Sequence, residues 1–380
     1  MNIDTGGTKD QKTSKVFFPN LNGVRAIAAL MVVVAHTELH KKAFNIPRIG
    51  GLNLFNLGKV GVTVFFSLSG FLITYLLLEE KKKFVKVNFK DFYIRRILRI
   101  WPLYFLVIIF GFFIYPKVHS AEALLLSVFF MPNIAFTLSL LPAIFDPIWS
   151  IGIEEQFYIF HPHFFRIKKT EHILYGMLIF MALFLGVSVA VSQFYHGENI
   201  AIKQLFYYAR YDNMMIGGIF AVLYFNTKNE QFDFKFQTLF NLIFNKYVQL
   251  LLVVSFFGFV GLYITYTIPR GDIILALLAV LLIINLCDTD TSIRNLTSEK
   301  FQFTGRVSYG IYLLHKFPLF LMLYLVKTYL STQNLVVQNL VLYAGTLTAA
   351  IGLAFVSYHG YEKYFLLLKK KFQKVPSGGE

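Results

Sequence analysis

The feature that most constrains this chain is its first apolar run, residues 21–40. A run of about 20 mostly apolar residues is long enough to cross a bilayer as one helix. This run carries Arg25 near its start and His36 near its end. An offset of eleven residues on an α-helix turns about 1100° and rises about 16.5 Å, so the two side chains share one face at two depths. Polar groups within a span usually face a bundle interior or a wet cavity, which makes this face the first candidate site.

Composition and the other apolar runs indicate a polytopic membrane protein. Hydrophobic residues make up 56% of the 380 residues and charged residues 15%, whereas soluble domains carry about 25% charged residues. We predict an all-α, polytopic membrane helix bundle of about ten transmembrane helices plus one re-entrant or tilted element. That element is the run at 121–141, because Pro132 and Asn133 interrupt it. The spans are expected near 21–40, 61–80, 101–115, 147–165, 172–194, 200–225, 247–268, 272–287, 307–328 and 335–358.

The distribution of basic residues predicts the topology. The formal net charge is +15 at pH 7, and Lys and Arg concentrate in alternate loops between the apolar runs, as they do in cytoplasmic loops. Topology explains this charge better than nucleic-acid binding, so no nucleic-acid partner is expected. We predict a multi-pass protein of the cytoplasmic (inner) membrane, with a cytoplasmic tail at 1–20, a membrane domain at 21–362 and a basic cytoplasmic tail at 363–380. Arg25 then lies near the cytoplasmic face and His36 in the outer half.

The predicted span that begins at Pro147 holds two adjacent carboxylates, Glu154 and Glu155. They lie roughly 10 Å below its outer end, a depth comparable with that of His36. Two helices could therefore bring an imidazole and a carboxylate together, which orients a general base and stabilises its protonated form. A structural polar contact between helices is an equally good interpretation. Adjacent helical residues point about 100° apart, so the two carboxylates are not expected to face the same partner.

Three arginines, Arg95, Arg96 and Arg99, cluster where the third predicted span leaves the cytoplasm. Arginine is well suited to bidentate recognition of phosphate, so a phosphorylated ligand could be held there. Basic residues at a cytoplasmic membrane edge are more often topology anchors or contacts to anionic lipid. Taken alone, the cluster favours that second interpretation.

Other polar residues within apolar segments have plainer interpretations. Arg210 and Asp212 form a predicted charged pair, for which a buried ion pair that fixes helix packing is favoured over a substrate contact. His315 could be an interfacial residue without a catalytic role. The sequence contains no HExxH, GxSxG or GxxxxGK[ST] motif, so metalloprotease, hydrolase-elbow and phosphate-loop functions lack their motifs. No metal site is expected.

Six blocks together resemble the acyltransferase-3 family of integral membrane acyltransferases, from about Asn20 to Glu362. LNGVRAIAALMVVVAH resembles its R-x10-H helix, GVTVFFSLSGFLI its F-F-x-x-S-G-F segment with Ser69, and FYIRRILRIWPLY its arginine-rich entry to the third helix. WSIGIEEQFYIFHP matches W-S-x-x-x-E-x-x-F-Y with Glu154 at the acidic position, while ARYDNMMIGGIFA and SYGIYLLHKFP resemble R-x-D-x-x-x-x-G-x-x-x-A and S-Y-x-x-Y-L-x-H-x-P. One departure is Lys363, where the family often has Pro after the acidic residue.

The resemblance implies transfer of an acyl group, commonly acetyl, from acyl-coenzyme A to a hydroxyl of a glycan or another envelope or secreted molecule. Acyl-CoA (acetyl-CoA) would be a donor substrate, and no permanently bound cofactor is expected. The expected partners are acyl-CoA, a glycan or lipid-linked saccharide acceptor, and membrane lipid. Some members carry an extra extracytoplasmic hydrolase-like domain. This chain ends soon after its last predicted span, so we expect it to act alone, to use a separate partner, or to accept a substrate directly.

We hypothesise that His36 acts as general base, or carries the acyl group transiently, and that Glu154 orients it or balances its charge. Arg25, Arg95, Arg96 and Arg99 would bind the donor, and the substrate or structural polar residues would be Arg210, Asp212, His315 and Ser69. The competing function is a proton-coupled secondary transporter of a small molecule, since intramembrane His, Glu and Arg also serve as proton relays. Such transporters are often built from paired repeats with broken helices at matching positions, and no such pairing is found in this sequence.

Overall fold

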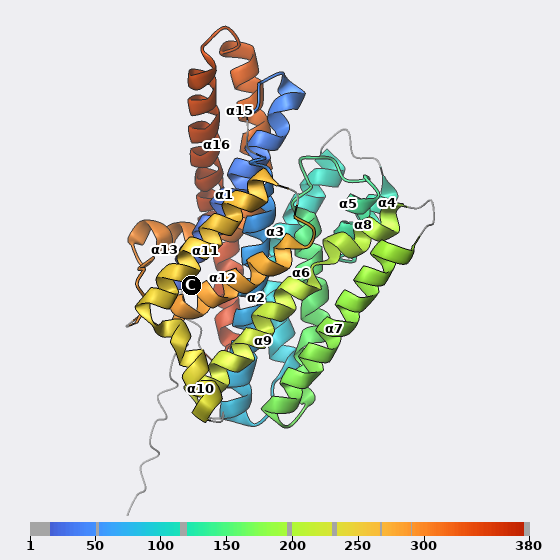
Figure 1. The fold of residues 1–380 in the computed structure, drawn as a ribbon. Coiled ribbons are helices and arrows are strands. Elements are labelled where there is room, and N and C mark those ends of the chain that lie inside the picture. Colours follow the sequence, from blue (N-terminus) through green and yellow to red (C-terminus); the bar gives the residue numbers. More distant parts are fainter. Residues whose placement is uncertain are drawn as a thin grey trace, which may run out of the picture.

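The computed structural model describes residues 16–50, 53–114, 120–195, 200–229, 234–266, 268–289 and 291–375 (Figure 1). The centre of the bundle is α2 (Asn56–Phe84), which packs against α1 (Asn20–His40), α9 (Tyr211–Lys228) and α12 (Gly271–Cys287). A Cβ atom at Gly217 would lie 2.1 Å from the Ser67 carbonyl oxygen. Only glycine therefore permits this close approach of α9 to α2, as small residues do in membrane helix pairs.

The run at 121–141 forms two short helices, α4 (Ala121–Val128) and α5 (Pro132–Thr137). They lie between α3 (Phe89–Ile109), which continues as a π-helix over Phe110–Ile114, and α6 (Ile148–Phe160), which continues as a 3-10 helix over His161–Arg166. A Cβ atom at Gly152 would lie 2.5 Å from the ring of Pro132, so α5 is packed tightly on α6. This run is not one membrane-length helix, in agreement with the prediction.

Two of the predicted spans are broken at a charged or titratable residue. The span at 200–225 is divided into α8 (Ile200–Ala209) and α9 at Arg210, whose backbone is left-handed with a φ of 46°. The span at 307–328 is divided into α14 (Ser308–Leu314) and α15 (Lys316–Tyr329), which are bent by 52° about His315. Hydropathy does not report backbone angles, so both breaks were invisible to the span prediction.

The remaining helices complete the bundle. α15 and α16 lie side by side and project beyond the other helices at the top of Figure 1. The other elements are a 3-10 helix over Lys41–Phe44, α7 (Thr170–Phe194), α10 (Phe234–Asn241), a 3-10 helix over Leu242–Phe244, α11 (Lys246–Thr265), α13 (Glu299–Arg306), α16 (Leu335–Ser357), a π-helix over Tyr358–Glu362, α17 (Lys363–Lys369) and a 3-10 helix over Lys370–Phe372.

The number of predicted spans is not confirmed. Within the described residues, six helices are long and apolar enough to cross a membrane, namely α1, α2, α3, α7, α11 and α16, and the bent pair α14–α15 would be a seventh. α6 has 13 residues and α12 has 17. At a rise of about 1.5 Å per residue, both are shorter than a hydrocarbon core of about 30 Å.

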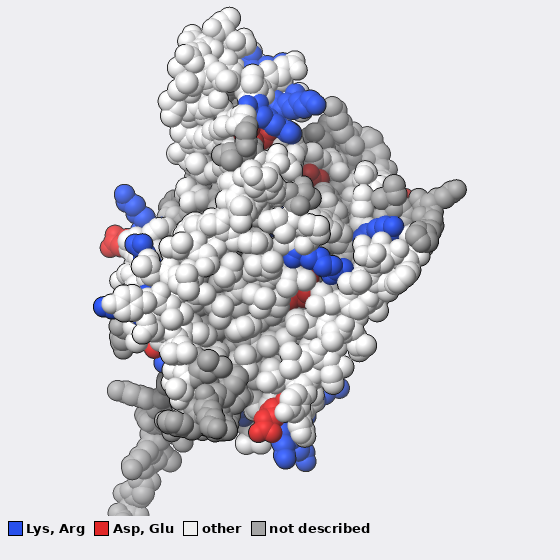
Figure 2. All heavy atoms as spheres, in the orientation of Figure 1, with Lys and Arg blue, Asp and Glu red and all other residues white. Residues whose placement is uncertain are grey.

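The surface fits a membrane protein. Broad parts of the face in Figure 2 carry no charged side chain. Large apolar side chains point outward from the long helices, for example Ile179 and Leu183 on α7 and Leu251 and Phe257 on α11, which are 60–65% exposed. Apolar surface of this extent is typical of a face that contacts lipid.

Candidate active site

A cavity lies beside the N-terminal halves of α1 and α3, where the arginines predicted to be cytoplasmic are found. Five cationic side chains line it, Arg25, Arg96, Arg99, Arg306 and Lys369, together with two carboxylates, Glu154 and Glu362. These residues come from α1, α3, α6, α13 and the C-terminal segment. Hydroxyl groups line it as well, from Ser69, Ser150, Tyr158, Ser308, Tyr309, Tyr312 and Tyr358. The cavity therefore combines an excess of positive charge with neutral hydrogen-bonding groups, a combination suited to an anionic ligand.

Arg96 shows how the cavity wall is built. The Asn88 side chain caps α3 by accepting a hydrogen bond from the Asp91 backbone N–H at 3.1 Å, which fixes the start of the helix and the direction of the arginines that follow. The Arg96 guanidinium lies between the rings of Phe92 and Tyr158, 5.6 and 5.5 Å from their centroids. Its buried Nε atom has no hydrogen-bond partner within the described part of the chain.

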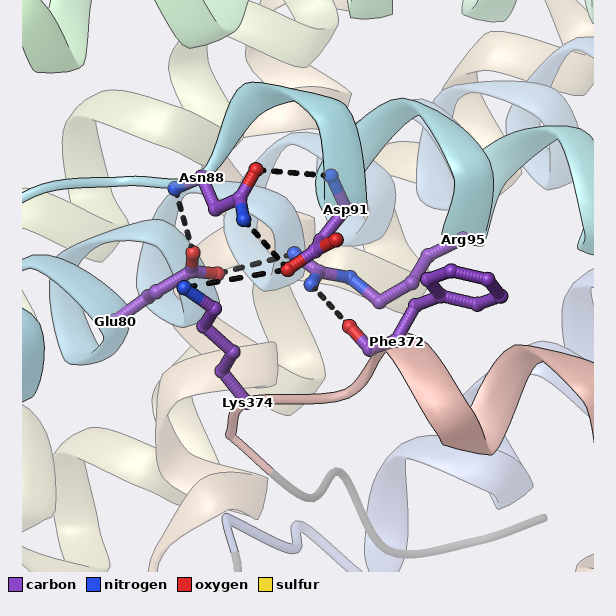
Figure 3. A network of polar contacts seen from close by, with 6 residues as sticks. All are labelled: Glu80, Asn88, Asp91, Arg95, Phe372 and Lys374. Carbon is purple, nitrogen blue, oxygen red and sulfur yellow. Dashed lines mark hydrogen bonds and ion pairs between the residues drawn. The ribbon is translucent and has the colours of Figure 1, made fainter.

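Arg95, the preceding residue, has a different environment (Figure 3). It donates to Glu80 Oε2 at 3.0 Å and to the Phe372 carbonyl oxygen at 2.8 Å. Asp91 extends the network to Lys374 with an ion pair of 4.0 Å. Arg95 does not line this cavity, although Arg95 and Arg96 both line a second, smaller pocket that shares residues with it. The bonds of Arg95 tie α2 and α3 to the C-terminal segment. The predicted arginine cluster is therefore divided between two environments.

The two adjacent carboxylates face different partners, as predicted. Glu154 accepts hydrogen bonds from the hydroxyl groups of Ser69 and Tyr158. Glu155 is buried, and its Oε2 atom accepts from Trp101 Nε1 at 2.9 Å. Ser69 lies on α2 and Tyr158 one helical turn after Glu154, so Glu154 forms part of the cavity wall on the side of α2.

The predicted contact between His36 and Glu154 is wrong. His36 Nδ1 instead lies 2.7 Å from His315 Nε2, and the two imidazole rings are parallel within 4°. The bend at His315 brings this second imidazole against α1 at the depth of His36. Ser69 and Tyr158 meanwhile occupy the hydrogen-bonding oxygen of Glu154, which depth along the helix alone did not reveal.

A second set of polar groups lies one turn beyond this histidine pair. Lys316 is fully buried, with its Nζ atom 2.6 Å from His40 Nε2 and 3.6 Å from Asp146 Oδ2. Asp146 lies in the turn before α6, outside the membrane-length helices. Burial raises the pKa of its carboxyl to about 6, although the nearby Lys316 acts to lower it. We call His36, His40, His315, Lys316 and Asp146 the histidine cluster.

The predicted ion pair between Arg210 and Asp212 is also wrong. Arg210 forms an ion pair with Asp272, in the first turn of α12. Asp212 accepts a hydrogen bond from the Asn213 backbone N–H at 3.0 Å. Because Arg210 is the left-handed residue that joins α8 to α9, its side chain leaves toward α12. The arrangement agrees with a role of Arg210 in helix packing.

Sequence reasoning missed several residues of the site. Ser150 and Tyr158 lie within the WSIGIEEQFYIFHP block, and Lys316 directly follows His315. The motifs assigned no role to any of the three. Arg306 and Lys369 were counted only as basic loop and tail residues. Among the residues that the structure describes, no group of three or more His, Cys, Asp or Glu side chains is placed to hold a metal ion.

Known proteins resemble this chain over most of its length. Residues 18–359 match the acyltransferase-3 family model, which is described as an acyltransferase domain. The "Peptidoglycan O-acetyltransferase OatA" of Listeria monocytogenes is 27% identical over 330 residues, 80% of this chain and 49% of that protein. The "Putative peptidoglycan O-acetyltransferase YrhL" of Bacillus subtilis is 27% identical over 327 residues, 79% of this chain and 48% of that protein. The chain thus spans about half the length of these relatives. No solved structure matches it. The chain belongs to the acyltransferase-3 family.

Proposed function

We propose that this chain is a membrane O-acyltransferase that moves an acetyl group from acetyl-CoA to a hydroxyl of a cell-envelope polymer such as peptidoglycan. The family and the names of the relatives support the reaction class and the acceptor. The observation that carries the proposal is the cationic cavity, whose wall at Tyr312 is joined by a hydrogen bond to the histidine pair.

The donor would bind in the cavity from the cytoplasmic side. Coenzyme A carries several phosphate groups, and planar guanidinium groups bind phosphate in a bidentate manner. Arg96 and Arg99 would contact these phosphates, and Arg25 would hold the pantetheine arm further along the cavity. In this topology both termini are cytoplasmic and His36 lies in the outer half of the membrane.

Ser150 and Tyr312 both line the cavity, and their hydroxyl groups lie 2.6 Å apart. Tyr312 accepts a hydrogen bond from His315 through its backbone carbonyl oxygen, at 2.7 Å. His315 in turn contacts His36, so one residue separates the cavity lining at Tyr312 from His36. The thioester would pass this point to reach the acceptor. Glu154 would hold Ser69 and Tyr158 at the cavity wall, because it accepts hydrogen bonds from both hydroxyl groups.

The transfer itself needs one base. His36 removes the proton from the acceptor hydroxyl as its oxygen attacks the thioester carbonyl carbon; the carbon–sulfur bond then breaks and the thiolate takes up the proton. In the second route, the His36 nitrogen attacks the thioester carbonyl carbon and the coenzyme A thiolate leaves; the acceptor hydroxyl oxygen then attacks the acetyl carbon, the bond to the imidazole breaks, and the hydroxyl proton passes to the thiolate. Both routes yield one acetyl ester and one free thiol.

The test is a transfer assay in proteoliposomes with radiolabelled acetyl-CoA and peptidoglycan fragments. His36→Ala is expected to lower the transfer rate by about 100-fold or more, the usual contribution of a general base. His172→Ala is the matched control, because His172 is exposed at the start of α7, and it should keep the native rate.

Two outcomes would contradict the proposal. A native rate in the folded His36→Ala protein would remove His36 from the reaction. Proton-coupled uptake of a small molecule by the native protein, with no acetyl transfer to any fragment, would favour the transporter instead.

A further inference from the structure

We infer that His315 is a positioning residue that fixes the tautomer of His36, so that Nε2 of His36 is the basic atom. This inference rests on the proposed function, because it concerns how His36 would serve as base or acyl carrier. It assigns to His315 a role that goes beyond a polar contact. One hydrogen-bonded chain runs from the Tyr312 carbonyl group through His315 to His36, and it fixes where the protons lie.

The first link of this chain has only one possible direction. His315 Nδ1 lies 2.7 Å from the Tyr312 carbonyl oxygen, and a carbonyl oxygen can only accept a hydrogen bond. His315 Nδ1 must therefore carry a proton. In a neutral imidazole the other nitrogen is then an unprotonated acceptor, so His315 Nε2 accepts from its neighbour.

The second link follows from the first. His36 Nδ1 lies 2.7 Å from His315 Nε2, so His36 Nδ1 must be the donor. His36 Nε2 is then left unprotonated. This atom makes no hydrogen bond to any described residue, and it is not fully buried. The lone pair of Nε2 is therefore not taken up by a described residue and is available to act as a base.

This proton arrangement requires both imidazoles to be neutral, and the surroundings favour that state. His315 is fully buried and His36 is half-buried, and burial disfavours an imidazolium ion. Lys316 follows His315 directly, and its ammonium group repels a second positive charge. The nearest carboxylate of the cluster, Asp146, lies 3.6 Å from Lys316 Nζ and is thus engaged by that lysine.

The break between α14 and α15 holds this chain of hydrogen bonds in place. His315 is at the 52° bend between α14 and α15, and its backbone N–H donates to the Ile311 carbonyl oxygen at 3.0 Å. Tyr312 is held by Ser150, which also lines the cavity. The orientation of the His36 ring is therefore set by His315, which is itself held by Tyr312, a residue that lines the cavity. A second histidine placed in this way fixes both the rotation and the tautomer of the first.

Two substitutions separate the contacts of His315. In His315→Asn, the amide nitrogen takes the place of Nδ1 and can still donate to Tyr312, but no acceptor reaches His36. In His315→Gln, the amide oxygen takes the place of Nε2 and can accept from His36. We expect kcat of acetyl transfer to fall about tenfold or more in His315→Asn and to be largely retained in His315→Gln. The KM for acetyl-CoA should stay unchanged in both variants, because His315 does not line the cavity.

Nitrogen-15 solid-state NMR of histidine-labelled protein in bilayers measures the tautomer without any reaction. The His36 signals are assigned by their loss in His36→Gln. Native protein is expected to show a protonated Nδ1 and an unprotonated Nε2, and His315→Asn a mixture of both tautomers. An Nε2-protonated His36 in native protein would overturn the inference, even where the substituted proteins fail to fold.

The outcomes of the two proposals remain distinct. Loss of transfer in His36→Ala, together with equal kcat in His315→Asn and His315→Gln, would contradict this inference and leave the proposed function standing. Absence of acetyl transfer in native protein would sink the proposed function, while the NMR spectrum still reports the tautomer.

Discussion

Arg95 and Arg96 are neighbours on α3, yet they belong to two different regions of the molecule. Arg95 lies in a network of paired groups, in which Glu80 and the Phe372 carbonyl oxygen occupy its guanidinium. Arg96 lies in the wall of the cavity between two aromatic rings, with a buried Nε atom that has no partner among the described residues. Adjacent helical residues point about 100° apart, which is enough to place one in each region.

Neighbouring arginines of one basic motif can therefore differ in role, one in structural contacts and the other at a cavity. Arg95 has a structural role that neither sequence interpretation included, because its bonds join α2 and α3 to the C-terminal segment. The ligand interpretation is proposed for Arg96, because it faces a space lined by other cations. A cluster of arginines in the sequence therefore has to be divided residue by residue before a role is given to it.

The largest effect on coenzyme A binding is expected from Arg96→Gln. Loss of its charge should weaken the binding of coenzyme A by about tenfold or more, which corresponds to about 1.4 kcal/mol, while the melting temperature changes little. The measurement is isothermal titration of purified protein with coenzyme A. Arg95→Gln is the matched control, with an expected affinity close to that of the native protein. Equal weakening in both would erase the distinction between the two regions.

A separate effect, on stability instead of affinity, is expected from Arg95→Gln. The ion pair to Glu80 is shielded, with the two side chains 12% and 2% exposed, and its loss should destabilise the protein by about 1–3 kcal/mol. Thermal unfolding in detergent measures the change. Lys374→Gln is the control, since its ion pair with Asp91 lies near the surface and should contribute less than about 1 kcal/mol. An unchanged melting temperature in Arg95→Gln would contradict this structural role.

Much of the fold followed from the sequence, because hydropathy reports which segments leave water. Every predicted span contains a helix in the structure, and the interruption by Pro132 was correctly placed. The breaks at Arg210 and His315 did not follow, because they depend on the left-handed backbone of one residue and on the packing around the other. A count of apolar runs therefore overestimates the number of membrane-length helices.

Individual residues of the site were predicted from the sequence, but the contacts between their side chains were not. Arg25, Arg96, Arg99 and Glu154 were singled out and do line one cavity. The pairing of His36 with His315 required the bend, which the sequence does not show. Asp272 was passed over because a polar residue at the start of an apolar helix looks like an ordinary helix end. Side-chain partners across helices depend on rotations that depth and spacing leave undetermined.

The most direct test of the donor cavity uses two matched cysteine substitutions. The native Cys287 is buried, so background labelling by a small methanethiosulfonate reagent should be low. Ser69 lines the cavity, whereas Ser298 is exposed before α13 and lies outside it. We predict that coenzyme A slows the labelling of Ser69→Cys and leaves that of Ser298→Cys unchanged. Equal labelling rates of Ser69→Cys with and without saturating coenzyme A would contradict donor binding in this cavity.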